Sequence, residues 1–406
     1  MTIVEAAPRT AERFQSRLDE GGVLDRRYTL AHADNATLDL VDTDGRAHRC
    51  TDFMSAYAAV NFGHRNPSIE RALAASSDLT GLFHGPEAEQ VARWLCGRLP
   101  APDSRRVLYQ VGGSFAVAAA LALARRRRPG RVMSIDGAFH GLGVDAAALT
   151  SVQRAFSLHD TGFADRLAPE VVHLPVGAVP RDWDDVSCLI YEPVQGAGGY
   201  VPLDRDWLGE LTAAAAAAEV VTIADEIQCG FFRHGMFSPS AAWGLDADIV
   251  LYSKSLTNGM YPLSAVVYRR FLEAGAGPLY LAHTFQTGTL GTAAAHEVTR
   301  FIDGTDVTGL AAAVGARLTE LADRLRAAGL ARAVHAVGPS LSFEPTAVAS
   351  GDLVRRAFAA GALVFSGGRH GERIRMAPPL TIPDAQLAEG IELVWSAAGG
   401  GRAGGR

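Results

Sequence analysis

Between about Val107 and Val267 the chain alternates short, fully apolar runs with longer helical stretches. A run that is apolar at every position is typical of a strand buried on both faces of a sheet. Such strands alternating with helices predict an α/β domain with a mostly parallel sheet. We expect strands in VLYQV, RVMSI, VVHLP, CLIYEP, VVTIADEI and DIVLYS, and helices in AVAAALALARR and WLGELTAAAAAA.

After about Leu290 the pattern changes to that of a smaller α+β domain. We expect helices near 290–302 and 306–328, a β-like VHAVGPSLSFEP, another helix, strands in ALVFSGG and ERIRMAPP, and a last helix near 383–397. The predicted parts are an N-terminal segment 1–50 joining the small domain, a large domain 51–290, a small domain 291–398 and a disordered tail 399–406.

The overall charge and the cysteine pattern exclude several classes of partner. With 38 Lys+Arg against 44 Asp+Glu the net charge is −6, so we expect no nucleic-acid partner. The apolar runs are alanine-rich and end in charges, and the N-terminus lacks a signal-peptide core, so we expect no membrane association. Cys50, Cys96, Cys188 and Cys229 form no CxxC pair and the histidines no HExxH motif, which predicts a cytoplasmic protein without a metal.

Only one of the 38 lysines and arginines, Lys254, is a lysine. A guanidinium stays protonated, whereas a lysine amine loses its proton when it is desolvated. Only the neutral amine can attack a carbonyl carbon and form a Schiff base. Lys254 is therefore the candidate nucleophile, and the plain alternative is that composition alone left one lysine in the chain.

Glycines and polar residues follow the predicted strands, at the sheet edge where α/β proteins bind their ligands. Gly112, Gly113 and Ser114 lie between a strand and a helix, so they could hold an anion at the helix N-terminus or form a plain capped turn. Asp225 ends a strand 29 residues before Lys254. Its carboxylate could pair with a protonated pyridine nitrogen or merely cap a helix.

Three further loops carry candidate residues. Phe139 in DGAFHGLG could stack on a planar cofactor, although a lone aromatic is more often part of a core. Glu192 stands at a strand end in YEPVQGAGG, and HTFQTGTLG is a hydroxyl-rich loop before a helix. Either of these two loops is common in proteins of unrelated function.

Seven segments follow one another as in class III (ornithine/ω-amino acid type) aminotransferases, and the resemblance covers nearly the whole chain. They are GGSFAVAAALALAR, GAFHG, EPVQGAGG, ADEIQCGFFRHG, SKSLTNGMYPLSAV, HTF and IRMAPPLTI. The resemblance implies a fold-type I transferase that uses pyridoxal 5′-phosphate (PLP) and works as a homodimer. It also implies a small-molecule amino donor and an oxo acceptor.

On these motifs, Lys254 resembles the lysine that binds PLP as a Schiff base and moves protons. Asp225 resembles the partner of the pyridine nitrogen, and Gln228 the donor to the phenolic oxygen of the ring. Phe139 matches the aromatic side chain that stacks on the ring. Thr284 matches a threonine that reaches the phosphate from the partner subunit in the family.

Other positions match the phosphate turn and the substrate pocket. Gly112, Gly113 and Ser114 resemble the turn that holds the phosphate. Arg375 resembles the arginine that binds a substrate carboxylate bidentately, and Tyr57 a tyrosine of the ornithine aminotransferase pocket.

The chain departs from the family at informative positions. Phe115 replaces an acidic residue after the serine, and Val111 and Gly112 replace a polar pair, which predicts altered phosphate contacts. Ala197 replaces a glutamate that neutralises the arginine in ornithine- and γ-aminobutyrate-type members. Arg375 would then stay available. The pocket motifs point in three directions, towards amine:pyruvate, diaminobutyrate and ornithine enzymes.

The leading hypothesis is an aminotransferase that moves an ω-amino group by a ping-pong mechanism, with glutamate and 2-oxoglutarate as a co-substrate pair. The mixture of pocket motifs suits a specialised biosynthetic pathway. Two alternatives remain open. One is an aminomutase, racemase or decarboxylase of the same fold, although mutase relatives tend to carry methionine where Gln228 stands. The other is a non-catalytic relative that serves as a scaffold.

Overall fold

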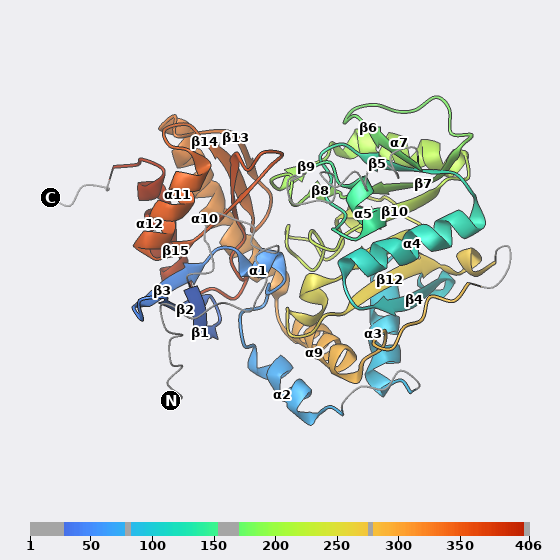
Figure 1. Cartoon of the computed structure of the whole chain (residues 1–406), viewed down its shortest axis with the longest axis horizontal. Helices are drawn as coiled ribbons and strands as arrows, with labels where there is room; N and C mark the ends of the chain where they lie inside the picture. Colours follow the sequence, from blue (N-terminus) through green and yellow to red (C-terminus); the bar gives the residue numbers. More distant parts are fainter. Residues whose placement is uncertain (1–27, 78–82, 153–169, 275–278, 402–406) are drawn as a thin grey trace.

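The computed structural model describes residues 28–77, 83–152, 170–274 and 279–401 (Figure 1). Residues 1–27 of the predicted N-terminal segment and 402–406 of the predicted tail lie outside the described residues. Two bodies lie side by side in the described chain (Figure 1). The middle of the sequence forms the larger body, and its two ends form the smaller one.

The larger body is built on a seven-stranded sheet with the order β4-β12-β11-β10-β7-β5-β6. β12 is antiparallel to both of its neighbours, while the other strands share one direction. The predicted α/β class, the mostly parallel sheet and its predicted strands are therefore confirmed. The strands are β4 (Arg105–Gln110), β5 (Arg131–Ile135), β6 (Val171–Leu174), β7 (Val186–Tyr191), β10 (Val221–Asp225), β11 (Ile249–Tyr252) and β12 (Ser264–Arg269).

The orientation of β12 follows from the connection that precedes it. A parallel neighbour needs a crossover of a dozen or more residues, usually a helix. The connection 253–263 after β11 contains only the short 3-10 helix η5 (Lys254–Thr257). The chain therefore turns back on itself, and β12, which the apolar pattern did not predict as a separate strand, enters the sheet antiparallel.

Apolar cores cover both faces of this sheet. Successive residues of a strand point to opposite faces. Cys188 and Ile190 of β7 belong to one apolar cluster, whereas Leu189 and Tyr191 belong to another. This is why the strands are apolar at every position. One face is covered by α4 (Gly113–Arg127) and α5 (Val144–Leu149), the other by α3 (Pro86–Gly97), α7 (Arg205–Ala217) and α9 (Thr289–Gly304).

The smaller body contains two four-stranded sheets, with the orders β13-β14-β17-β16 and β1-β2-β3-β15. The predicted strand ALVFSGG is divided between them, because β15 pairs with β3 and β16 pairs with β17. The first sheet has β13 (Ala331–Ala336), β14 (Leu341–Pro345), β16 (Phe365–Gly367) and β17 (Arg373–Met376); the second has β1 (Tyr28–Asp34), β2 (Thr37–Asp42), β3 (Ala47–Asp52) and β15 (Ala362–Leu363).

Helix α10 (Val307–Ala327) connects the two cores. Val307 and Ala311 belong to the core of the larger body, while Val314 and Leu318 belong to that of the smaller. Before it, α9 packs on α2 (Pro67–Ala75) and α3 of the larger body. The remaining helices of the smaller body are α11 (Ser350–Ala360) and α12 (Asp384–Ala397). Helices α9, α10 and α12 confirm the helices expected near 290–302, 306–328 and 383–397.

No helix within the described ranges is long and apolar enough to cross a membrane. No group of three or more His, Cys, Asp or Glu side chains in the same ranges is arranged to hold a metal ion. The four cysteines are free thiols.

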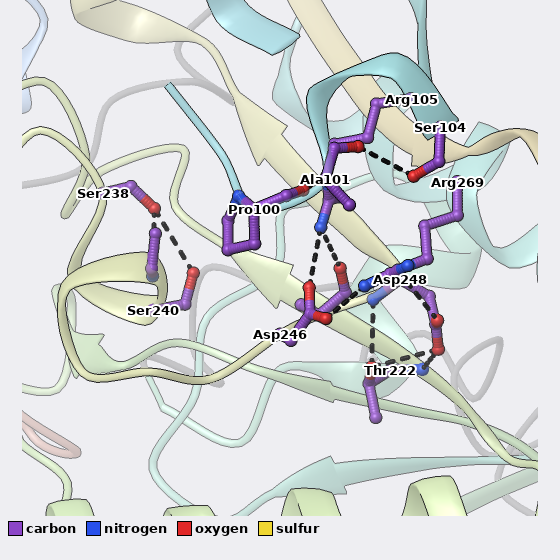
Figure 2. Close-up of polar contacts among 12 residues, drawn as sticks. Pro100, Ala101, Ser104, Arg105, Thr222, Ser238, Ser240, Asp246, Asp248 and Arg269 are labelled. Carbon is purple, nitrogen blue, oxygen red and sulfur yellow. Dashed lines mark hydrogen bonds and ion pairs between the residues drawn. The ribbon is translucent and has the colours of Figure 1, made fainter. Parts of the chain in front are cut away.

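A polar network ties the amino ends of neighbouring parallel strands together (Figure 2). Arg105, at the start of β4, donates to Asp246 Oδ1 at 3.1 Å, and Asp246 also pairs with Arg269 at the end of β12. Asp248, just before β11, accepts from the backbone N–H and the hydroxyl of Thr222 on β10 at 3.0 and 3.1 Å. These contacts fix the strands at the edge opposite to their carboxyl ends.

Replacing Arg105 with alanine should lower the free energy of unfolding by about 2–4 kcal/mol. Its buried guanidinium donates to the carbonyls of Pro100 and Ala247, which would lose their donor. The exposed neighbour Arg106 offers a matched control, and Arg106→Ala should cost less than about 0.5 kcal/mol. Denaturant titrations would check both values, and equal losses would contradict the importance of the network.

Candidate active site

Lys254 and Asp225 follow adjacent parallel strands at the same edge of the sheet. Asp225 ends β10 and pairs in register with Leu251 of β11, and Lys254 begins η5 just after β11. Lys254 has a φ of 47°, in the left-handed region that a residue with a Cβ seldom adopts. Backbone strain of this kind persists only where the surrounding contacts impose it. The backbone conformation of Lys254 in turn fixes the direction of its side chain.

Burial lowers the pKa of the Lys254 amine to about 8. The carboxylates of Glu192 and Asp225 act in the opposite direction, and the charge of Arg375 adds to the lowering. Burial therefore outweighs the attraction of two carboxylates. Below pH 8 the amine is mostly protonated and above it mostly neutral, so near neutral pH it can both accept and release a proton.

Asp225 is buried and held by donors from two elements. Its Oδ2 lies 2.7 Å from Nδ1 of His140, and its Oδ1 accepts the backbone N–H of Ile227 at 3.1 Å. An ionised carboxylate has further lone pairs, so Asp225 can accept another donor. Sequence reasoning did not select His140, although it directly follows Phe139 in GAFHG. Its Nε2 is buried and has no hydrogen-bond partner among the described residues.

The turn before α4 leaves open space in front of the helix N-terminus. Gly112 has a φ of 148°, and a Cβ there would meet no atom within 4 Å. A Cβ on Gly113 would lie 3.2 Å from the Ile227 side chain. The first N–H groups of a helix have no intrahelical partner, which favours an anion at this position. The hydroxyl of Ser114 accepts the N–H of Leu142 at 3.3 Å and keeps its own proton for donation.

Glu192 joins the loop of Phe139 to the turn 196–200. Its Oε1 accepts the N–H of Phe139 at 2.8 Å and its Oε2 that of Gly196 at 3.0 Å. Burial raises the pKa of Glu192 to about 7. The carboxyl group of Glu192 thus has two roles. It positions the backbone of Phe139 by a hydrogen bond, and its charge acts on Lys254.

Tyr57 lies in a left-handed turn that the sequence did not predict. Ser55, Ala56, Tyr57 and Ala58, assigned as α1 (Ser55–Ala58), have φ values of 46°, 48°, 59° and 64°. Each such residue costs roughly 1–2 kcal/mol in an L-peptide. No glycine or asparagine in SAYA signals this conformation.

Residues that flank Asp225 and Lys254 hold this turn in place. Gln228 Nε2 donates to the carbonyl of Tyr57 at 2.9 Å, and the hydroxyl of Ser255 donates to that of Ala58 at 2.9 Å. The amide of Gln228 has a second N–H, which stays available for another acceptor.

Arg375 on β17 is buried and reaches the same turn 196–200. Its Nη1 donates to the carbonyl of Gly196 at 2.8 Å and its Nη2 to that of Ser366 at 3.0 Å. Among the described residues no carboxylate lies within ion-pair distance of it, and its Nε has no partner. Burial lowers the pKa of Arg375. Alanine stands at position 197, and the acidic side chain that acts on this cation is Glu192, through its charge and without an ion pair.

Thr284 lies apart from these residues, on the surface. Its neighbour His283 is bonded to Gln110 at 3.0 Å, and the ring of His283 lies 6.0 Å from that of Phe115 at the start of α4. The neighbouring His283 therefore lies close to the start of α4, while Thr284 itself is exposed. The other predicted site residues of the larger body follow strands at one sheet edge, and Tyr57 and Arg375 approach that edge from α1 and β17.

Comparisons with known proteins agree with this geometry. A family model described as Aminotransferase class-III matches residues 25–397. The chain is 27% identical over 429 residues to a probable 4-aminobutyrate aminotransferase of Bacillus subtilis (strain 168), covering 95% of this chain and 97% of the relative. It is 29% identical over 394 residues to a diaminobutyrate–2-oxoglutarate transaminase of Nocardia farcinica (strain IFM 10152), covering 88% and 87%.

A solved structure shows the same fold. An ornithine aminotransferase of Toxoplasma gondii, described with partial occupancy of PLP at its active site, matches with a TM-score of 0.77 and 21% identity. The match covers 91% of this chain and 90% of that one.

The pKa of about 8 predicts how Lys254 reacts with a small aldehyde. Reductive methylation of the cofactor-free protein with formaldehyde and cyanoborohydride should level off above about pH 8, because the amine is then already neutral. An ordinary lysine would gain about tenfold in rate per pH unit up to about pH 10. Mass spectrometry of the peptide with Lys254 measures the rate, and urea-unfolded protein is the control. Identical pH profiles for folded and unfolded protein would contradict the lowered pKa.

Proposed function

The chain belongs to the class III aminotransferase family, and we propose that it moves a terminal (ω) amino group from an amine or amino acid to an oxo acid or aldehyde. The enzyme is a PLP-dependent transaminase of fold type I. Glutamate and 2-oxoglutarate are the proposed co-substrate pair. The order is ping-pong: the first substrate leaves before the second binds.

The described residues fit PLP. The open space at Gly112 and the free N–H groups of α4 suit a phosphate, together with the hydroxyl of Ser114. The buried carboxylate of Asp225 keeps a free lone pair for a pyridinium N–H, and Lys254 offers an amine that loses its proton near neutral pH. These features supply a donor or acceptor for the phosphate, the ring nitrogen and the aldehyde.

When bound, PLP supplies an aldehyde that takes up the amino group and a ring that withdraws electrons. In our proposal Lys254 holds the aldehyde carbon and then carries a proton on Nζ between two carbon atoms. Asp225 keeps the ring nitrogen protonated, with His140 fixing the carboxylate. Phe139 stacks on the ring, and Gln228 donates its second N–H to the phenolic oxygen.

The proposed phosphate-binding turn consists of Gly112, Gly113 and Ser114. Tyr57 is proposed to line the substrate pocket. Phe115, which replaces an acidic residue, is 57% exposed and makes no polar contact with this turn. The phosphate is then held mainly by backbone N–H groups and the hydroxyl of Ser114.

Arg375 is the observation that carries the choice of glutamate. Its buried guanidinium is bonded only to neutral carbonyls, yet its charge acts on Lys254. A carboxylate is a stronger, bidentate acceptor than either carbonyl. We propose that one carboxylate of glutamate or 2-oxoglutarate binds Arg375 while the amino or oxo carbon lies at Lys254.

We propose a homodimer in which Thr284 of each protomer reaches the phosphate bound by the other. Exposed large apolar side chains occur on the segments next to Thr284, and exposed apolar patches often mark interfaces. His84, which follows Phe83, is bonded to Thr287 at 2.9 Å. Phe115 is in ring contact with His283, which precedes Thr284. The side chains are Phe83 (71% exposed), Phe115 (57%), Tyr280 (87%) and Phe285 (51%).

A cytoplasmic location and the division into domains are also proposals. Free thiols suit a reducing compartment. For the small domain 291–398, the packing of α9 on the larger core favours a boundary inside α10, near Ala311, over one at residue 290.

Arg375→Ala should lower kcat/KM for glutamate by about 10²–10³-fold, because a buried carboxylate would lose its charged partner. The half-reaction with pentylamine, which carries no carboxylate, should stay within about threefold. Arg373→Ala is the matched control, since Arg373 is buried in the same strand but already paired with Glu344 at 3.3 Å. Stopped-flow spectra of each half-reaction give the values. An equal loss for both donors would show that Arg375 does not select the carboxylate.

Phe285→Asp should convert the dimer into monomers and weaken PLP binding at least tenfold. A carboxylate inserted beside Thr284 would have to be buried at the proposed interface. Phe271→Asp is the control, because Phe271 is exposed to a similar extent (47% against 51%) but lies in η6 (Arg270–Glu273), which contacts the C-terminal end of α4 through Arg126. Sedimentation velocity and PLP titration measure the two effects. A Phe285→Asp protein that sediments as a dimer would refute this interface.

A further inference from the structure

Arg375 is the least satisfied of the buried arginines in the described chain. Arg105 and Arg373 have carboxylate partners, Asp246 at 3.1 Å and Glu344 at 3.3 Å. Arg233 donates to oxygens of Asn61, Ala377, Pro378 and Pro339. Arg375 donates to only two carbonyls, and the nearby Glu192 acts on it through its charge without an ion pair. A buried cation without a directly bonded counter-ion is costly, so groups around it must offset part of its charge.

The ring of Phe365 is the nearer of two aromatic rings that offset part of this charge, the other being that of Tyr200. Phe365 and Arg375 face each other in register across β16 and β17, and such cross-strand pairs lie on the same face of the sheet. The Cζ atom of Arg375 lies 4.2 Å from the ring centroid of Phe365, within cation–π range. Phe365 is 7% exposed and Arg375 3%, and cation–π contacts are strongest out of water.

Gly367, two residues further along β16, leaves room for this stack. A Cβ at Gly367 would lie 2.7 Å from Cδ and 2.9 Å from Cζ of Arg375. Any larger residue would therefore push the guanidinium off the ring. Strand β16 thus offers the ring of Phe365 to the guanidinium of Arg375, while Gly367 leaves space for the aliphatic part of the Arg375 side chain.

Phe365 also links Arg375 to the proposed substrate pocket. Its ring meets the edge of Tyr57 at a centroid distance of 5.6 Å and an angle of 89°. On another side it lies 6.5 Å from the ring of Tyr200, which is itself 5.7 Å from Cζ of Arg375. A substrate that contacts both Tyr57 and Arg375 must pass beside Phe365.

We propose that Phe365 determines specificity: its ring offsets the charge of Arg375 when no substrate carboxylate does so, and the pocket therefore accepts amino donors with and without a distal carboxylate. This inference rests on the proposed function. A bound carboxylate neutralises the guanidinium and makes the ring nearly dispensable. With a donor that ends in a methyl group, the ring is the main compensation for the buried charge.

The test compares two donors that differ only in the distal group, 5-aminopentanoate and pentylamine. In Phe365→Leu, kcat/KM for pentylamine should fall about tenfold relative to 5-aminopentanoate, since leucine keeps apolar bulk but has no π face. The change should be in KM, because Phe365 does not touch the reacting atoms. Phe365→Tyr keeps the ring and should restore the wild-type ratio. Phe343→Leu, a buried phenylalanine opposite Ile374, should leave the ratio unchanged.

An unchanged ratio in Phe365→Leu, or one that shifts in favour of pentylamine, would overturn the proposal. A second measurement separates this from failure of the proposed function. Calorimetric binding of glutarate, which does not react, should be at least as tight in Phe365→Leu as in wild type, while Arg375→Ala should weaken it about tenfold or more. Glutarate binding weakened more than about threefold in Phe365→Leu would mean that the ring only shapes the pocket. If the wild-type protein transaminates neither donor, the proposed function fails. The effect of Phe365→Leu on glutarate binding then decides alone whether the ring acts on the charge of Arg375.

Discussion

The withdrawal of one amine from water is the constraint on which the site depends. Burial brings the pKa of Lys254 down to about 8 against the attraction of Glu192 and Asp225. That balance requires a dry edge of the sheet with two carboxylates close enough to act but bonded elsewhere. Asp225 is bonded to His140 and Ile227, and Glu192 to backbone N–H groups. The polar network of Arg105 fixes the strands at the opposite edge, which leaves the carboxyl ends free for chemistry.

Backbone strain is concentrated at the same edge. Lys254 and the turn Ser55–Ala58 all have positive φ values, and the strained segments stabilise each other. Gln228 and Ser255, which flank Asp225 and Lys254, donate to carbonyls of the left-handed turn. Local strain persists only where the surroundings over-determine it. The elements carrying the amine, the carboxylate and Tyr57 are thus fixed relative to one another before any ligand binds.

The sequence predicted what depends on local pattern and missed what depends on pairing between distant segments. Fully apolar runs predict central strands, and the positions of Asp225 and Lys254 after successive strands predict that they share one sheet edge. The antiparallel β12 follows from a connection too short for a crossover, which an apolar pattern does not reveal. The turn at Tyr57 lacks the glycine that would signal it. From the sequence alone, Phe365 is indistinguishable from an ordinary core residue, because its position opposite Arg375 depends on the pairing of β16 with β17.

Two buried cations in this chain are treated differently, and the difference bears on function. Arg105 is paired with Asp246 and helps to hold the sheet together, so its charge has a structural role. Arg375 is bonded to carbonyls and stacked on a ring, neither of which carries a full negative charge. A neutral environment offsets a cation only in part, whereas a carboxylate offsets it fully. With Ala197 in place of an acidic residue, Arg375 has no directly bonded carboxylate among the described residues, and in our proposal the substrate supplies one.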